Sequence, residues 1–223
     1  MQKTALLVGI AVMIAAPTMA TAVPIIANGS FEAVQIGSAY STNLADIPDW
    51  THTGTVGDAL PWNKNFPICC GGTGTALAGD GNQFVTMGGG FGPTGSSQWS
   101  QTLTGLSIGQ TYVVSFMMAA EGETPTQQMT VGMTTGSSTA AETFTSLTTS
   151  TLFWQNWGTD QYTFVASDTS GTLQFSVTDQ AYDVGLDAVS IAEARTVPEP
   201  ATLGLMGLGL SALGFARRKR KSN

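Results

Sequence analysis

The middle of the chain is a series of short runs in which apolar and polar residues alternate. The cleanest run covers 172–178, where Leu173, Phe175 and Val177 are separated by threonine, glutamine and serine. A period of two places every second side chain on the same face, which is typical of a β-strand buried on one side. Comparable runs predict further strands at 23–27, 83–87, 97–103, 128–134, 157–166 and 184–192, and Trp50 starts a further extended segment.

One run is apolar on both faces. Between 111 and 119, large apolar side chains occupy every second position, and Val113 and Met117 add apolar side chains to the other face. This pattern predicts a strand in the middle of a sheet, covered on both sides. A turn at 105–109 joins it to the run at 97–103.

Turn-forming residues separate all of these runs, and loops rich in glycine or proline occupy 57–74 and 88–95. No stretch has a convincing helical period. About eight to ten short strands separated by turns predict an all-β fold, a two-sheet antiparallel β-sandwich of the jelly-roll type.

The N-terminus differs from this central part. Lys3 precedes an apolar run at 5–16, and Ala20-Thr21-Ala22 fits the small-residue pattern of a signal-peptidase site. We predict a signal peptide at 1–22 and a processed chain that begins at Val23, with cleavage after Ala20 as the alternative. The Sec machinery would therefore export the protein.

The C-terminus has three features in a fixed order. Pro198, Glu199 and Pro200 come first, and an uncharged, mostly apolar run at 201–216 follows. A helix of this length rises ~24 Å against a hydrocarbon core of ~30 Å, so we predict a short transmembrane segment. Basic residues stay on the cytoplasmic side and stop translocation. The predicted stop consists of Arg217, Arg218, Lys219, Arg220 and Lys221.

This combination resembles the PEP-CTERM sorting signal of Gram-negative bacteria. The resemblance covers 197–223 and leaves 23–196 as one domain. It implies that an exosortase, a membrane protease, recognises the tail and cleaves it near the Pro-Glu-Pro triplet. It also implies an inner-membrane-anchored precursor and a product at the cell surface or in the extracellular matrix, where such proteins are linked to exopolysaccharide and biofilm.

The formal net charge of −7 conceals a sharp division of charge along the chain. Six of the eight cations lie in the terminal segments, which leaves Lys64 and Arg195 in the predicted domain. Fourteen of the fifteen acidic residues lie in that domain, so its net charge is −12. Such a surface repels phosphate backbones, which argues against nucleic acid as a partner, and attracts cations such as calcium.

Cysteine and histidine are too scarce to predict a zinc site. The only cysteines, Cys69 and Cys70, are adjacent, and His52 is the single histidine. In an oxidising compartment the two cysteines form a strained vicinal disulfide, pair with another chain or remain free thiols, and the sequence leaves these alternatives open.

A second resemblance covers nearly the whole domain. Its landmarks are NGSFE at 28–32, Trp50, QTLTGLSIGQTYVVSF at 101–116, W-x4-Y-x-F at 157–164 and LDAVSI at 186–191. Their order looks like the galactose-binding-like jelly roll, which occurs in many carbohydrate-binding modules. In that fold the first and last strands lie side by side.

The same resemblance implies a calcium ion that ties the segment after the first strand to the last strand. By position, Glu32 and Asp187 are the candidate side-chain ligands, with a backbone oxygen from Asn28 or a neighbour. Two carboxylates with carbonyl oxygens suit a hard cation that takes six to eight oxygen ligands. The chain departs from the family pattern at Leu186, where a second acid is common. Such an ion would be structural, and the alternative is an ordinary capping or surface carboxylate at each position.

Tryptophan supplies the candidate sugar contacts, because the C–H faces of sugar rings stack on aromatic side chains. Trp50, Trp99 and Trp157 fall at framework positions of the resemblance, so we expect them in the core. Trp62, in the long loop, and Trp154 are the better candidates for exposed glycan contacts, and Tyr40 joins them.

Two enzyme-like motifs do not predict an enzyme. Residues 105–109 read G-x-S-x-G, but a nucleophilic serine in that motif needs a strand-to-helix turn and a later histidine, whereas His52 comes earlier. Residues 90–95 read G-x-G-x-x-G, but Pro93 interrupts them and no helix is expected to follow.

Acidic pairs in predicted loops are the remaining candidates for chemistry. They are Glu121 with Glu123 and Asp179 with Asp183. A glycosidase needs two carboxylates that face each other across the substrate at a set distance, so we interpret these pairs as solvated loop acids. We predict an exported surface or matrix protein with a non-catalytic, glycan-binding domain. The alternatives are a structural or adhesive biofilm component without a small ligand, and a secreted glycan hydrolase or lyase.

Overall fold

Ten strands in two sheets make up the described part of the chain. The computed structural model describes residues 24–54, 61–64, 77–88, 96–121, 127–146, 154–178 and 183–194. Within these ranges the elements are a 3-10 helix η1 (Leu44–Asp46) and the strands β1 (Thr51–Gly54), β2 (Pro61–Asn63), β3 (Gln83–Met87), β4 (Ser96–Thr104), β5 (Thr111–Ala120), β6 (Gln128–Thr135), β7 (Ser138–Thr145), β8 (Gly158–Val165), β9 (Ser170–Thr178) and β10 (Val184–Glu193).

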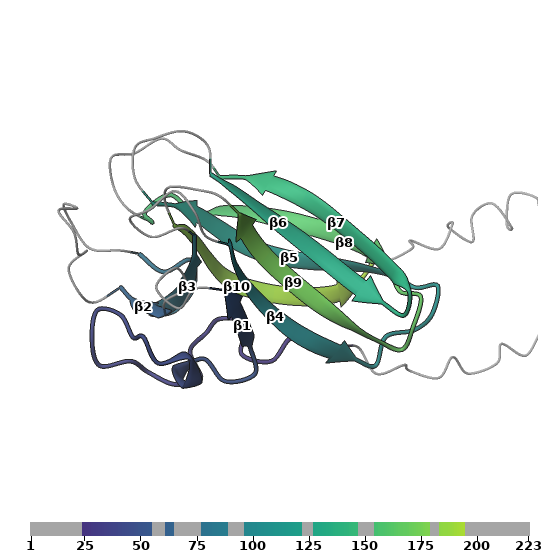
Figure 1. Cartoon of the computed structure of the whole chain (residues 1–223), viewed down its shortest axis with the longest axis horizontal. Coiled ribbons are helices and arrows are strands. Elements are labelled where there is room, and N and C mark those ends of the chain that lie inside the picture. Colours follow the sequence, from purple (N-terminus) through teal and green to yellow (C-terminus); the bar gives the residue numbers. More distant parts are fainter. Residues whose placement is uncertain are drawn as a thin grey trace, which may run out of the picture.

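The strands form two antiparallel five-stranded sheets. The first sheet has the order β1-β4-β9-β6-β7, and the second has the order β2-β3-β10-β5-β8. Figure 1 shows the long strands of both sheets running in nearly the same direction, as in an aligned β-sandwich. The predicted two-sheet β-sandwich is therefore confirmed.

Inward-facing side chains of both sheets form one hydrophobic core. Trp99 and Phe175 of the first sheet and Tyr112 and Phe116 of the second are completely buried. Phe116 and Phe175 meet edge to face across the sandwich, with ring centroids 5.4 Å apart. This geometry is favourable for aromatic pairs, and the alternation of apolar residues along the chain accounts for it.

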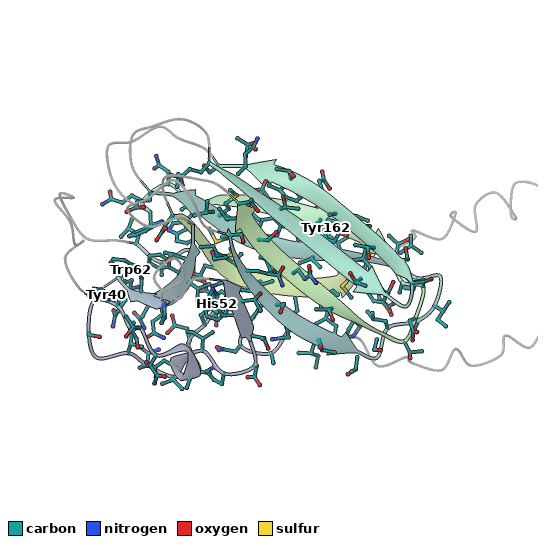
Figure 2. All side chains as sticks on the ribbon, viewed as in Figure 1. Tyr40, His52, Trp62 and Tyr162 are labelled. Carbon is teal, nitrogen blue, oxygen red and sulfur yellow. The ribbon has the colours of Figure 1, made fainter. Side chains whose placement is uncertain are left out.

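The hydroxyl of Tyr162 ties the two sheets together at their outer strands. Tyr162 lies on β8, and its hydroxyl donates a hydrogen bond of 2.7 Å to the carbonyl of Ala140 on β7. The side chain, labelled in Figure 2, is buried. This bond satisfies a polar group that would otherwise be buried unpaired.

Most predicted strands are confirmed to within two residues at each end. The run at 111–119 is β5, which lies between β10 and β8 in the second sheet. The turn at 105–109 joins β4 to β5 as predicted, and these two strands belong to different sheets, so the turn crosses the sandwich edge. Two strands, β2 and β7, were not predicted.

The strand predicted at 23–27 is wrong. Residues 24–26 are irregular and 27–30 form a turn. This segment nevertheless lies beside the last strand, because the Val189 N–H donates a 2.8 Å hydrogen bond to the carbonyl of Gly29. Gly29 permits this approach, since a Cβ there would lie 2.0 Å from the Val189 carbonyl oxygen. The first segment therefore pairs with β10 at one point.

Candidate ligand-binding and cation sites

The structure brings Glu32 and Asp187 to the same loop, residues 79–83. Asp187 is fully buried on β10 and accepts hydrogen bonds from the Asp80 N–H (2.8 Å) and the Ala188 N–H (2.7 Å). Glu32 Oε1 accepts from the N–H of Gln83 at 2.6 Å and from that of Asn82. The two predicted carboxylates are therefore joined through one short stretch of backbone.

A β-bulge aims Asp187 at this loop. The pairing of β10 with β5 shifts register between Asp187 and Ser190, and Ala188 has φ of 50°. Bulges redirect side chains that would otherwise follow the alternation of the strand. The sequence indicates this bulge, because the buried apolar residues Leu186 and Val189 are three positions apart, whereas the regular alternation of a strand would place them two apart.

Asp187 is a poorly solvated carboxylate with like charges nearby. The pKa of Asp187 is raised to about 7, mainly by burial and also by the negative charges of Asp80 and Glu32, which together outweigh the lowering effect of its two backbone hydrogen bonds. A divalent cation would offset this repulsion. The donors are hard oxygens, so the chemistry of the set fits calcium.

Asn28 does not fit the ligand role that its position implied. Its carbonyl oxygen already accepts hydrogen bonds from the Phe31 N–H (3.1 Å) and the Trp50 Nε1–H (3.0 Å). Its amide group donates to the Pro48 carbonyl and accepts from the Ala33 N–H, both at 3.0 Å. The residue holds the N-terminal segment together and leaves no lone pair of its carbonyl oxygen unused.

The number of side-chain ligands is small. Among the described residues, no three His, Cys, Asp or Glu side chains form a group that could hold a metal ion. An ion between Glu32 and Asp187 would therefore take most of its ligands from backbone carbonyls and water.

The exposure expected for Trp62 and Trp154 is wrong. Trp62 is 4% exposed and Trp154 is 1% exposed, and their ring centroids lie 4.7 Å apart. They lie on the outer face of the second sheet, Trp62 on its edge strand β2, and they pack with Phe84 of β3 and Ala119 of β5. This second, smaller cluster buries both indole rings apart from the main core.

Gly185 of β10 makes room for this cluster. A Cβ at Gly185 would lie 2.9 Å from the Trp157 ring and 3.0 Å from the Trp154 ring. Trp157 itself is half-buried, and its Nε1–H donates to the carbonyls of Leu77 (2.7 Å) and Trp154 (3.1 Å). We expected Trp157 in the core, and it packs instead against this outer cluster.

Tyr40 is the exposed member of the predicted aromatic set. It is 42% exposed, and its ring lies 5.3 Å from that of Trp62 at an angle of 40°. Figure 2 shows the two side chains next to each other at one end of the sandwich. A backbone bridge between Tyr40 and Trp62 fixes their relative position. Trp50 and Trp99 are buried in the main core, as predicted.

The G-x-S-x-G motif lies in the β4–β5 turn, without a following helix. The Ser107 N–H donates to the Tyr112 hydroxyl at 2.9 Å, so the motif anchors a turn. His52 is half-buried on β1 with its ring 5.1 Å from Trp99, far along the chain from that turn.

Of the acidic pairs, the structure describes Glu121 and Asp183, which are joined to each other. The Asp183 N–H donates to Glu121 Oε2 at 2.8 Å, and burial raises the pKa of Glu121. The solvated state that we expected of Glu121 is therefore wrong. Glu123 and Asp179 lie outside the described residues.

The alternation of the first sheet creates a surface that sequence reasoning did not assign. Its outward positions are the alternate residues of 51–53, 96–104, 170–178, 128–134 and 139–145, which we call the hydroxyl face. All are Ser, Thr or Gln except Gly132 and Ala141. An open hollow of about 510 Å³ borders this face beside β1 and β4, with Ile25, Asp49, Gln101 and Thr104 among its lining.

Several predicted features lie outside the described residues. They are the signal peptide, the cysteine pair, Pro198, Glu199 and Pro200, the predicted transmembrane segment at 201–216 and the basic residues 217–221. Within the described residues, no helix has the length and apolar character needed to cross a membrane.

Comparison with known proteins finds a sorting motif at the C-terminus and a known fold for the β-sandwich. A model of the PEP-CTERM protein-sorting motif matches residues 196–221. This motif indicates an exported, exosortase-processed, membrane-anchored precursor. No curated protein matches the chain.

Solved structures are similar in fold at low sequence identity. TmCBM61, solved in complex with β-1,4-galactotriose, superposes with a TM-score of 0.52 at 17% identity, over 75% of this chain and 96% of its own. The CBM22-1 xylan-binding domain of Xyn10C from Paenibacillus barcinonensis has a TM-score of 0.47 at 15% identity, over 81% of this chain and 100% of its own. The enzymatically active domain of tailspike protein 4 from bacteriophage CBA120 has a TM-score of 0.48 at 11% identity, over 76% of this chain and 21% of its own. The chain thus joins a β-sandwich with the fold of carbohydrate-binding modules to a PEP-CTERM protein-sorting motif.

Proposed function

We propose that the chain is an exported protein of the cell surface or extracellular matrix whose β-sandwich binds a glycan without catalysing a reaction on it. The observation that carries this proposal is the combination of a sorting motif at 196–221 with a module-like sandwich over most of the remaining chain. The exposed ring of Tyr40 and the polar outer face of the first sheet supply the two kinds of contact that sugars use. The matrix polysaccharide of a Gram-negative biofilm is the proposed setting.

Tyr40 is the proposed aromatic contact. It is exposed, and the buried Trp62 supports its ring from behind, with Trp154 next to Trp62. A supported ring loses little conformational freedom when a sugar stacks on it. Trp62 and Trp154 therefore act by holding Tyr40 in place.

A glycan array tests the proposal with the full chain purified in mild detergent. We expect binding of a subset of glycans by the wild type and a loss of about tenfold in Tyr40→Ala, the cost of one aromatic stacking contact. Ile108→Ala is the matched control, because Ile108 is 69% exposed in the β4–β5 turn. Unchanged binding by Tyr40→Ala would remove Tyr40 from the contact set. A blank array would favour a structural or adhesive role.

Catalysis is tested separately. Incubation of the full chain with the polysaccharides that it binds should release no reducing sugar above a heat-denatured control. Measurable release would support the hydrolase or lyase alternative and make the half-buried Glu121 the first candidate for mutation.

We further propose that Glu32 and Asp187 hold a structural calcium ion, with Asp80 close enough to contribute charge. The support is the buried carboxylate of Asp187, the like charges beside it and the shared loop at 79–83. Such an ion would fasten the N-terminal segment and β10 to that loop.

A further inference from the structure

Cross-strand register aligns the side chains of the hydroxyl face in rows. Thr102, Thr172, Thr134 and Thr139 are direct neighbours on β4, β9, β6 and β7. A second row runs through Gln98, Ser176, Thr130 and Thr143 on the same strands. These two rows are four residues apart along each strand, which is about 13.6 Å, and the row between them contains Ser100, Gln174, Gly132 and Ala141; neighbouring strands are about 4.8 Å apart.

Hydrogen bonds within the rows hold hydroxyl groups in place. The Thr130 and Thr143 hydroxyls lie 3.0 Å apart, and those of Thr134 and Thr139 lie 3.2 Å apart. A threonine hydroxyl has one donor and two acceptor positions, so each keeps the capacity to bond a ligand. β-Branching also restricts the side chain to few rotamers, which keeps the array ordered.

The hydroxyl face carries no charge in an otherwise acidic domain. No outward side chain of the described strands β1, β4, β9, β6 and β7 is ionisable. Glu142 of β7 pairs with the buried Val131 and therefore lies on the inner side, where burial raises the pKa of Tyr162 and the charge of Glu142 adds a smaller increase. The domain has a net charge of −12, so this neutrality is a local property of the face.

The hollow beside the face adds one carboxylate. It lies beside the first residue of β1, Thr51, where β4 extends past β1. Asp49, Thr51, Thr102 and Thr104 contribute to its lining. Thr51, Thr102 and Thr104 also belong to the hydroxyl face, so the hollow and the face form one continuous surface. Its volume of about 510 Å³ falls within the range of small-molecule sites.

We infer that this surface binds an extended, uncharged polysaccharide by hydrogen bonds, with one residue of the polymer in the hollow next to Asp49. The inference rests on the proposed glycan-binding function, and it adds to the Tyr40 contact a second surface and a ligand class. Sugar hydroxyls are donors and acceptors like those of the face. Each water-exposed hydrogen bond contributes little net free energy, so a polymer that contacts several rows is needed.

The same features disfavour other occupants. A polymer that carries uronic acids would be repelled by Asp49 and by the domain charge. A protein partner would find no aromatic or large aliphatic side chain among the outward positions of the five described strands, whereas protein interfaces have apolar, aromatic-rich centres.

Retention of the full chain on immobilised polysaccharides tests the inference. The probes are neutral β-1,4-galactan, neutral xylan and anionic polygalacturonate. We expect retention on at least one neutral polymer, rising with chain length, and weak retention on polygalacturonate. The triple variant Thr102→Val, Thr172→Val, Thr134→Val should lose at least about tenfold in retention, since it removes one row of hydroxyls and keeps strand-forming residues.

Two further variants keep the result interpretable. Thr159→Val with Thr163→Val changes exposed threonines of β8 in the second sheet and should leave retention unchanged. Thr134→Lys places a cation in the middle of the face, so it should lower retention on the neutral polymer and raise it on polygalacturonate. Melting curves confirm that each variant is folded.

The outcomes separate this inference from the proposed function. If the wild type is retained and the triple variant matches it, the inference is overturned and the glycan-binding function stands. If the wild type is retained on none of the polymers and the array is also blank, both fail. Equal retention on polygalacturonate would overturn the uncharged ligand class. If light scattering shows a dimer that only the triple variant converts to a monomer, with retention unchanged, the face binds a second copy and the inference fails.

Discussion

Asp187 makes the stability of the domain depend on pH in a direction opposite to that of most carboxylates. Its pKa is about 7 in the folded domain, whereas an aspartate in an unfolded chain titrates near pH ~4. Between these values the folded state binds more protons than the unfolded state. The free energy of unfolding therefore decreases as pH rises through this window.

We predict that, in EDTA, the melting temperature falls from pH 5 to pH 8. Asp187→Asn should flatten this dependence, by on the order of 1–3 kcal/mol across the window, because the titrating group is gone. Glu121 and Asp160 have pKa values raised by burial, so a smaller slope of the same sign should remain. A melting temperature that rises with pH would contradict the prediction.

Calcium should reverse this trend. The ion binds the ionised carboxylates, so we expect it to raise the melting temperature most at pH 8, with little effect in Asp187→Asn or Glu32→Gln. Glu142→Gln on the edge strand β7 is the control and should respond like the wild type. The proposed calcium ion would be ruled out if calcium at pH 8 left the melting temperature of the wild type unchanged.

Gly29 offers a second test at this scale. A Cβ there would lie 2.0 Å from the Val189 carbonyl, so Gly29→Ala should separate the N-terminal segment from β10. We expect a loss of about 2–4 kcal/mol in urea unfolding. Gly37→Ala is the matched control, because nothing lies within 4 Å of the added Cβ, and it should change stability by less than about 0.5 kcal/mol.

Among the elements, those with a regular apolar alternation could be predicted from the sequence. β9 and β6 appear where the pattern placed them, because one face of each strand meets the core. β7 could not be predicted in this way. Its residues are nearly all exposed, and only Phe144 reaches the core, so edge pairing with β6 forms it rather than burial.

The candidate sites were predictable only in part, for a related reason. Glu32 and Asp187 belong to short motifs whose positions in the fold a resemblance could supply, and the structure joins them. The burial of Trp62 depends on the pairing of β2 with β3, and that of Trp154 on its packing against Trp62 and Phe84, and neither contact is encoded in a periodicity. The hydroxyl face depends on the register between strands distant in sequence, which a single strand pattern does not contain.

Phe144 should decide whether β7 stays attached. It packs edge to face on Phe116 with ring centroids 5.1 Å apart. Phe144→Ala should cost about 2 kcal/mol and speed hydrogen exchange of the 138–145 amides ahead of the other strands. Thr145→Ala, which changes an exposed outward residue of the same strand, is the control. Uniform acceleration across both sheets would show that β7 is not a separate unit.

At the scale of the whole molecule, positive and negative side chains lie in different parts of the chain. The domain is acidic, and the cations are concentrated in the segments predicted for export and sorting. We predict that mass spectrometry of the cell-surface form finds a chain that begins at Val23 and ends near Pro200. Lys64 and Arg195 would then be its only cations. A surface form that retains the basic residues at 217–221 would contradict processing at the motif.

The outer aromatic cluster gives the protein an optical signature of its own. Trp62 and Trp154 come from distant parts of the chain, and their rings lie 4.7 Å apart at 45°. Indole transitions at this distance and angle couple, so the folded protein should show a paired circular-dichroism band that disappears when the two segments separate. Circular dichroism of the unlabelled protein can therefore follow the unfolding of this outer cluster separately from that of the main core.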